Sequence, residues 1–211
     1  MKQKLTLTRG YLAILMVALM VGVLSPYAIA TQQAAWSADG AHTAINFSVN
    51  HFFTPVNGSF EDFEVTLAYD DVNPEKSTVE ARIRVASVNT GNQKRDDHLR
   101  SADWFDAENY PYMTFTSTSV RKVGENQLIA SGPLTIRGTS RNVELPITLL
   151  GTQMIPEKMQ PMLGGTTRVA SFQSSMTIDR GDFGVGVGSW AGNMIVGSEI
   201  DIEILLEAHN K

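Results

Sequence analysis

The residues best suited to chemistry gather in one short stretch, NQKRDDHLRSADWFD, which covers residues 92–106. It contains three basic side chains, four aspartates, one of the chain's four histidines, and Trp104 beside Phe105. A histidine among carboxylates is the composition of a metal site and also of a general acid–base pair. Which of these roles His98 could serve depends on the side chains that the local structure brings beside it.

The same stretch is predicted to form a short helix. It lacks the alternation of a strand, it contains many helix-forming residues, and Asn92 is a suitable N-cap, so the helix is expected over 93–101. A second turn is expected around 102–106. Pro111 ends the segment, because the residue before a proline prefers an extended backbone. We therefore expect a helical insertion around 93–106 between two strands.

Helical spacing separates His98 from the aspartates nearest to it in sequence. Residues three and four positions away share a helix face. For His98 none of these is a carboxylate or an imidazole: they are Lys94, Arg95, Ser101 and Ala102. Asp96 lies on the opposite side of the helix, whereas a strand would place it on the same face as His98 and restore the metal hypothesis. The helical interpretation predicts no metal site here.

No other pattern of residues indicates catalysis or metal binding. His42, His51 and His209 occur in no ligand spacing such as HxH or HExxH, and the chain has no cysteine and no GxSxG motif. The glycine-rich run RGDFGVGVGSWAG, residues 180–192, fits neither GxGxxG nor a P-loop, so we expect its glycines to let a strand bend or cross close to another backbone at a barrel corner. The sequence thus predicts a protein that is not an enzyme and has no metal and no cofactor.

Residues 1–30 have the features of a secretory signal peptide. The start is basic, residues 11–24 are apolar, and the small residues at 28–30 form a cleavage site. The apolar run is short for a membrane span. Cleavage is therefore predicted after Ala30, which leaves a mature domain of 31–211 with no integral membrane segment.

Charge and cysteine content narrow the class of partner. The leader carries three basic residues, so the mature chain has 14 Lys and Arg against 22 Asp and Glu, a net charge near −8. This balance argues against a nucleic-acid partner and against electrostatic binding to anionic lipid headgroups. A secreted chain without cysteine has no disulfides, which suits a bacterial periplasm.

From Trp36 onward the hydrophobic pattern has a period of two residues, which is typical of β-strands. Turn-forming residues separate the strands, among them PVNGS at 55–59 and IPEKMQPMLGG at 155–165. Each strand has one apolar face and no helix is long enough to cover a sheet, so the fold is a closed antiparallel barrel or a sandwich. Eight strands are expected, at 42–51, 63–70, 79–86, 112–120, 126–138, 143–150, 167–179 and 198–208.

Two motifs make a resemblance to a known family specific: the run VNTGNQKRDDHLRSADWFDAENYPYMTFTSTSV, which begins at Val88, and GPLTIRGTSR, which begins at Gly132. With these motifs the mature chain resembles the YceI-like family of periplasmic polyisoprenoid-binding proteins. Trp104 stands where the family usually has phenylalanine. The resemblance implies an all-β, antiparallel, eight-stranded lipocalin-like barrel that holds an isoprenoid or related lipid, with no enzymatic activity firmly attached to the fold.

The resemblance also implies which side chains would meet such a lipid. Arg95, His98 and His51 would lie at the rim, near the headgroup. The barrel lining that contacts the tail would comprise Phe47, Val49, Phe60, Phe63, Ile83, Trp104, Phe105, Phe115, Leu134, Phe172 and Phe183.

Three functional hypotheses follow. The first is a periplasmic, non-enzymatic protein that binds, sequesters or transports a long-chain amphiphilic lipid such as a polyisoprenoid, a prenyl quinone or a fatty acid. The second is a metal-dependent or acid–base enzyme that acts on a hydrophobic substrate through His98. The third is a stress-induced envelope protein that contacts a partner through the Met-rich loop 153–163. A homodimer is an open alternative for the oligomeric state.

Overall fold

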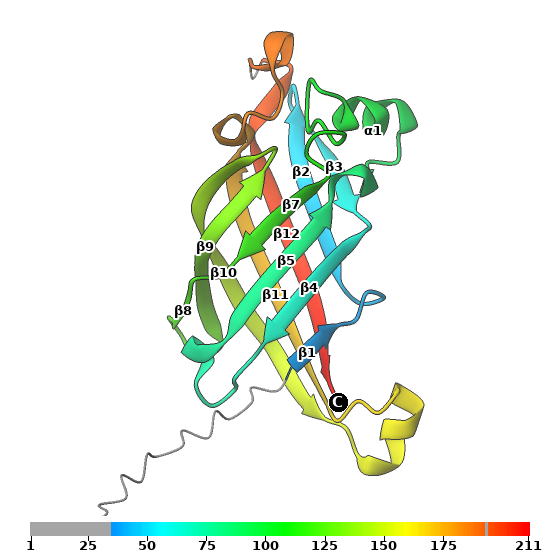
Figure 1. The fold of residues 1–211 in the computed structure, drawn as a ribbon, viewed down its shortest axis with the longest axis vertical. Coiled ribbons are helices and arrows are strands. Elements are labelled where there is room, and N and C mark those ends of the chain that lie inside the picture. Colours follow the sequence, from blue (N-terminus) through cyan, green and yellow to red (C-terminus); the bar gives the residue numbers. More distant parts are fainter. Residues whose placement is uncertain (1–34, 193) are drawn as a thin grey trace, which may run out of the picture. The chain divides into compact units, whose positions relative to one another are not determined.

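The computed structural model describes residues 35–192 and 194–211, which form one closed antiparallel β-barrel (Figure 1). The predicted signal peptide, 1–30, lies outside the described residues. The strands are β1 (Ala35–Ala38), β2 (Ala44–His51), β3 (Thr54–Phe60), β4 (Phe63–Ala68), β5 (Thr78–Arg84), β6 (Val88–Asn89), β7 (Tyr112–Thr116), β8 (Ser119–Lys122), β9 (Gln127–Ile136), β10 (Thr139–Met154), β11 (Arg168–Asp179) and β12 (Val196–Asn210). The helical segments are α1 (Gln93–Arg100) and the 3-10 turns η1 (Pro74–Lys76), η2 (Val85–Ser87), η3 (Glu157–Leu163), η4 (Arg180–Phe183) and η5 (Gly188–Trp190).

The barrel has eight strand positions because four of them are each filled by two successive strands. Both β1 and β2 pair with β12. On their other side, β1 pairs with β4 and β2 pairs with β3. In the same way β4 pairs with β5, and β3 pairs with β6. Both β7 and β8 pair with β9. The remaining positions are β9 to β12, joined as antiparallel neighbours. The predicted eight-stranded antiparallel barrel is confirmed.

Alternation along each strand separates the barrel interior from its surface. In β12, Ile200, Ile202 and Ile204 line the interior, whereas Asp201 and Glu203 are exposed. This is the period of two residues that a pleated strand imposes on its side chains. In the described part of the chain no helix is both long and apolar enough to cross a membrane.

The prediction of a turn at 55–59 is wrong, because these residues belong to β3. The turn lies earlier, at Phe52 and Phe53, since the last residue of β2, His51, pairs with Thr54. Gly58 is not a turn residue but a place of close approach: a Cβ atom there would lie 2.3 Å from the Phe47 ring on β2. A glycine inside a strand often marks such a contact.

The glycine-rich run 180–192 also differs from its prediction. It is not a bent strand, because β11 ends at Asp179 and the chain continues through the turns η4 and η5 before β12 begins. The predicted helix is confirmed as α1, with Asn92 as its N-cap: Asn92 Oδ1 accepts from the backbone N–H of Arg95 at 3.2 Å. Figure 1 shows α1 and the 180–192 loop at one end of the barrel and the loop that contains η3 at the other end.

Candidate ligand-binding site

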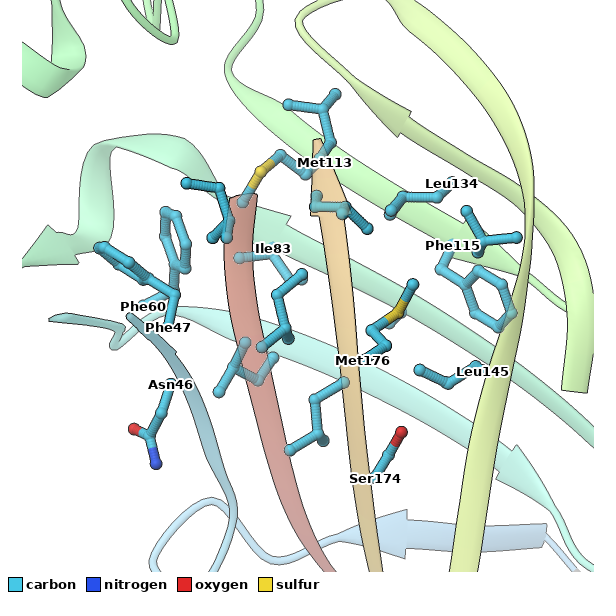
Figure 2. A pocket seen from close by; sticks show the side chains of 18 of the residues that line it. Asn46, Phe47, Phe60, Ile83, Met113, Phe115, Leu134, Leu145, Ser174 and Met176 are labelled. Atoms are coloured by element: carbon cyan, nitrogen blue, oxygen red, sulfur yellow. The ribbon is translucent and has the colours of Figure 1, made fainter. Parts of the chain in front are cut away.

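A cavity of about 430 Å³ occupies the barrel interior, and its wall is almost entirely apolar. Figure 2 shows side chains from several strands converging on this space, among them Phe60, Ile83, Phe115 and Met176. Ligand sites for small molecules commonly have volumes of roughly 300–1,000 Å³, with apolar walls and few polar groups. The interior of this barrel therefore has the size and chemistry of a binding site for an apolar molecule.

The residues predicted to line the barrel do so with one exception. Phe63 is half-buried and packs against the cluster around Phe60 and Trp104, but it is not part of the cavity wall. It is the first residue of β4, directly after the break at 61–62, so its ring lies at a strand end. The residues that line the cavity as predicted are Phe47, Val49, Phe60, Ile83, Trp104, Phe105, Phe115, Leu134, Phe172 and Phe183.

Sequence reasoning missed the aliphatic part of the wall. The missed residues come from most strands of the barrel, and their signal was clearest in the alternation of β10, β11 and β12. Prominent among them are Leu145, Ile147, Met176, Ile200, Ile202 and Ile204. Aromatic residues drew attention because of their size, yet aliphatic side chains from many strands also line the cavity.

The cavity reaches the surface at the end of the barrel that carries α1. His51, at the end of β2, and Ile195, just before β12, both line the cavity and are both exposed. The neighbouring hairpin tip is apolar, with Phe52 at 55% and Phe53 at 97% exposure. The backbone N–H of Phe52 donates to the carbonyl of Ile195 at 2.7 Å, which joins the two sides of this rim.

His98 lies at this end among aromatic rings. Its Nε2 accepts from the indole N–H of Trp104 at 3.3 Å, and its ring lies edge-on to Trp190 with 5.0 Å between centroids. A carboxylate does approach, contrary to the expectation from helix neighbours: Asp103 Oδ2 is 3.7 Å from His98 Nε2. It belongs to the turn after α1, which helical spacing could not anticipate.

Three charged side chains of the 92–106 stretch fix α1 to the preceding segment. Asp96 is 5% exposed, and its Oδ1 accepts from the backbone N–H and the hydroxyl of Thr90 at 2.9 and 2.6 Å. Arg95 donates to the hydroxyl and carbonyl oxygens of the same threonine at 2.7 and 2.9 Å. Arg100 donates to the carbonyls of Ala86 and Val88, both at 2.9 Å. The stretch is thus chiefly an anchored cap, with Arg95 and His98 lining the cavity.

Comparison with known proteins identifies the family. The sequence model of the YceI-like domain matches residues 36–208. The chain belongs to the YceI-like family. The protein YceI of Escherichia coli O157:H7 is 40% identical over 114 residues, which are 54% of this chain and 59% of that protein. The match therefore spans less than two thirds of the relative's length.

Solved structures show the same YceI-like barrel. BcnA of Burkholderia cenocepacia is 27% identical with a TM-score of 0.72, covering 81% of this chain and 98% of that one. A polyisoprenoid binding domain from Saccharophagus degradans has a TM-score of 0.60 over 84% of this chain and 99% of that one. It is 14% identical, so the second likeness concerns the fold alone.

A buried arginine lies beside Trp104 at the same end of the YceI-like barrel. Arg180 is 4% exposed, and among the described residues it forms no ion pair. Its guanidinium lies 5.2 Å from the centre of the Trp104 ring. Instead of a carboxylate it binds five backbone carbonyls at 2.8–3.1 Å, those of Val185, Trp190, Gly192, Val196 and Gly197.

This arrangement has electrostatic and steric consequences. Burial lowers the pKa of Arg180 from its usual value, yet a guanidinium keeps its charge at working pH. Gly186, with φ of +79°, is required beside it, because a Cβ atom there would lie 2.3 Å from Arg180 Nη1. The arginine therefore ties the 180–192 loop to the start of β12 and holds Trp190 near Trp104, where the two ring centroids are 5.7 Å apart.

Aromatic rings pack together at the opposite end of the barrel. Tyr69 packs edge-on to Trp36 and to Phe172, with 5.8 and 5.2 Å between ring centroids. The indole N–H of Trp36 donates to the Tyr69 carbonyl at 3.1 Å. Burial raises the pKa of the Tyr69 phenol, and the charge of Asp71 adds to this effect. The phenol is therefore neutral at physiological pH, as a largely apolar barrel end requires.

Ser174 is a polar residue of the cavity wall in an unfavourable environment. It is 6% exposed, and no hydrogen-bond partner for its hydroxyl lies among the described residues. We expect Ser174→Ala to raise the free energy of unfolding of lipid-free protein by about 1 kcal/mol, because an unpaired buried hydroxyl is costly. Urea unfolding measures this change. Ser175→Ala, at the exposed neighbouring position, is the control and should change stability by less than about 0.5 kcal/mol. A less stable Ser174→Ala protein would contradict the expectation.

Proposed function

We propose that this YceI-like barrel binds a long-chain amphiphilic lipid, such as a polyisoprenoid, a prenyl quinone or a fatty acid, and sequesters or transports it. The observation that carries the proposal is the apolar cavity of about 430 Å³ inside a closed barrel. Burial of an alkyl or prenyl chain there is favourable by about 0.8 kcal/mol for each CH₂ group. A barrel of the same fold, from Saccharophagus degradans, is a polyisoprenoid binding domain.

In this proposal the headgroup lies at the open end. His51, Arg95 and His98 line the cavity there, while the closed end around Tyr69 is aromatic. An amphiphile bound tail-first keeps its polar group in contact with these side chains and with water. The apolar hairpin tip at Phe52 and Phe53 borders the same opening, which suits the passage of a lipid.

We further propose that the barrel binds its ligand without transforming it. His98 Nε2, the atom that a general base would use, accepts from Trp104 and faces Asp103 at 3.7 Å across the rim. An enzyme that acts through His98 remains the rival hypothesis.

The signal peptide predicted for 1–30 supports a periplasmic location.

The test is lipid analysis of protein purified from its own host without added ligand. Native mass spectrometry of the intact protein and mass spectrometry of the organic extract should show one class of prenyl or fatty-acyl molecule, chemically unaltered. A barrel that is purified empty and binds neither prenyl quinols nor fatty acids would contradict the proposal. If the purified protein converts the extracted lipid to a product, and His98→Ala abolishes this conversion, the result would favour the hypothesis of an enzyme that acts through His98.

The Met-rich loop supports a second role as a contact site. Its apolar side chains are exposed: Met154 at 61%, Met159 at 44%, Met162 at 85% and Leu163 at 43%. The loop lies at the end opposite α1 (Figure 1). Replacing 157–163 by a short glycine–serine turn is therefore expected to leave lipid content unchanged while abolishing cross-linking to an envelope partner. Loss of lipid from this variant would contradict the separation of the two roles.

A further inference from the structure

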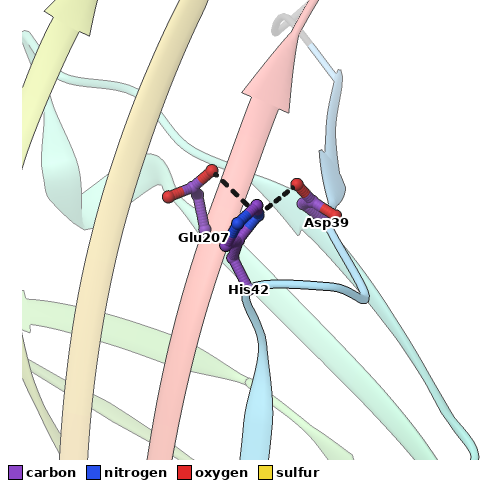
Figure 3. Close-up of side chains that lie close together, drawn as sticks. All are labelled: Asp39, His42 and Glu207. Carbon is purple, nitrogen blue, oxygen red and sulfur yellow. Dashed lines mark hydrogen bonds and ion pairs between the residues drawn. The ribbon is translucent and has the colours of Figure 1, made fainter.

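Four titratable side chains meet on the outside of the barrel, far from α1 in the fold. We call this group the seam cluster; it consists of Asp39, His42, Glu207 and His209. His42 Nδ1 is 2.8 Å from Asp39 Oδ2 and 3.7 Å from Glu207 Oε1, as Figure 3 shows. His209 Nε2 is 2.9 Å from Glu207 Oε1 and 3.7 Å from Asp39 Oδ2. Two imidazoles thus face the same two carboxylate oxygens.

The fold builds this cluster at the seam where the barrel closes. Strands β1 and β12 pair in the register Ala38 with Ala208, so Glu207 and His209 flank a fully buried alanine and point outward together. The backbone N–H of Asp39 donates to the Glu207 carbonyl at 2.8 Å. These contacts join the end of β1 and the following turn to the last residues of β12.

Hydrogen bonds to the backbone orient the side chains of Asp39 and His42 even without an ion. Asp39 Oδ1 accepts from the backbone N–H of Ala41 at 3.0 Å, which turns Oδ2 toward the imidazoles. The backbone N–H of His42 donates to the Asp39 carbonyl at 3.1 Å and fixes the turn that presents its ring. Asp39, Glu207 and His209 have side chains only 22–29% exposed, so three of the four donors are held against the barrel.

The donor atoms have the chemistry of a zinc site, and their nitrogen–oxygen distances are close to those of a tetrahedral one. Imidazole nitrogens and carboxylate oxygens are ligands of Zn²⁺, at about 2.0–2.2 Å from the ion. A tetrahedron of that size separates its ligand atoms by about 3.3 Å. The four nitrogen–oxygen separations in the seam cluster, 2.8–3.7 Å, bracket this value. The ligand atoms of Asp39, His42 and Glu207 all lie within 4.8 Å of one another, so these three side chains form the compact part of the site and His209 Nε2 would move inward to complete it.

We propose that the seam cluster is a binding site for a divalent transition metal ion of the Zn²⁺ type. Only three residue pairs join β1 to β12. An ion held by both sides would fasten this short junction, and because it binds the folded chain it would stabilise the barrel. The site is separate from the lipid cavity, since none of its four residues is part of the cavity wall.

The competing explanation is a network of hydrogen bonds and ion pairs without metal. The hydrogen bond to Asp39 raises the pKa of His42, and the same bond lowers the pKa of Asp39. Such a network also joins β1 to β12, but it gives no response to added metal. The two explanations therefore differ in one measurable quantity, the dependence of stability on Zn²⁺.

Calorimetric titration of the tag-free full chain with Zn²⁺, after treatment with EDTA, tests the proposal. We expect one ion per chain and, with free Zn²⁺ at 100 times its Kd, a rise in Tm on the order of 5 °C. Glu207→Gln and His209→Asn should each weaken binding at least tenfold. Glu203→Gln, which removes an exposed carboxylate from the same face of β12, is the matched control and should bind as tightly as the unchanged chain.

Two outcomes would overturn the inference. One is a chain that shows neither binding heat nor a change in Tm with Zn²⁺. The other is equal binding by the unchanged chain, Glu207→Gln and His209→Asn, which would indicate ions held elsewhere on the acidic surface. Because these substitutions lie outside the barrel core, the variants are expected to fold; Co²⁺ absorption in the visible range provides a second readout, intense for a tetrahedral site and lost in both variants.

Discussion

Arg180→Met is expected to lower the free energy of unfolding by about 3 kcal/mol or more. The substitution keeps much of the apolar contact with Trp104 but removes all the donors that serve five backbone carbonyls. A buried acceptor left without a donor costs about 1–3 kcal/mol. Part of that cost is recovered when the 180–192 loop loosens and water reaches the carbonyls, which is why the expected loss is less than the sum over five. Equilibrium unfolding in urea measures the change.

Two further substitutions make this experiment specific. Arg180→Lys retains the charge but has one ammonium group, which cannot reach carbonyls on both sides of the planar guanidinium, so most of the loss should remain. Arg121→Met removes an arginine that is 54% exposed and paired with Glu144 on the surface, and it should cost less than about 1 kcal/mol. If Arg180→Met were no more harmful than Arg121→Met, the carbonyl contacts would have no structural role.

The elements that could be predicted from sequence are those whose signal is local. The segment 198–208 alternates isoleucine with acidic residues, and β12 has the expected faces. Asn92 followed by helix formers predicted α1, and the cap bond is present. In both cases the residues that specify the element are the residues that form it, so no knowledge of distant contacts was needed.

The features that could not be predicted depend on contacts between distant segments. Gly58 looks like a turn residue, yet its role is set by the Phe47 ring on the neighbouring strand. Arg180 forms no ion pair within the described part of the chain, because its acceptors are backbone carbonyls of the following loop and of the start of β12. The position of Asp103 beside His98 depends on the turn that leaves α1.

The seam cluster is an intermediate case. Glu207 belongs to the predicted strand 198–208, and His209 lies just beyond it; because β12 extends to Asn210, the two side chains share a face. The partners Asp39 and His42 come from the other end of the mature chain, and only closure of the barrel brings them near. A search for histidine spacings such as HxH therefore finds no part of this site, because its partners lie at opposite ends of the domain.

Ala81→Trp is expected to reduce bound lipid at least tenfold. Ala81 is the smallest side chain that β5 contributes to the cavity wall, and it lies opposite Phe115 of β7. An indole at this position would project into the cavity and occupy space that the proposed ligand needs. Overpacking costs stability only where the space is already filled, so a variant that fills the cavity should fold. Native mass spectrometry of the purified variant gives the occupied fraction.

Glu80→Trp is the matched control for Ala81→Trp. Glu80 is the preceding residue of β5 and is exposed, so the same ring is added on the outside of the barrel. Lipid content equal to that of the unchanged chain is expected for Glu80→Trp. Should Ala81→Trp retain its lipid as well, the ligand would lie outside the barrel and the cavity would have another use. Because the two variants differ only in the face of one strand that carries the ring, a difference between them places the lipid inside.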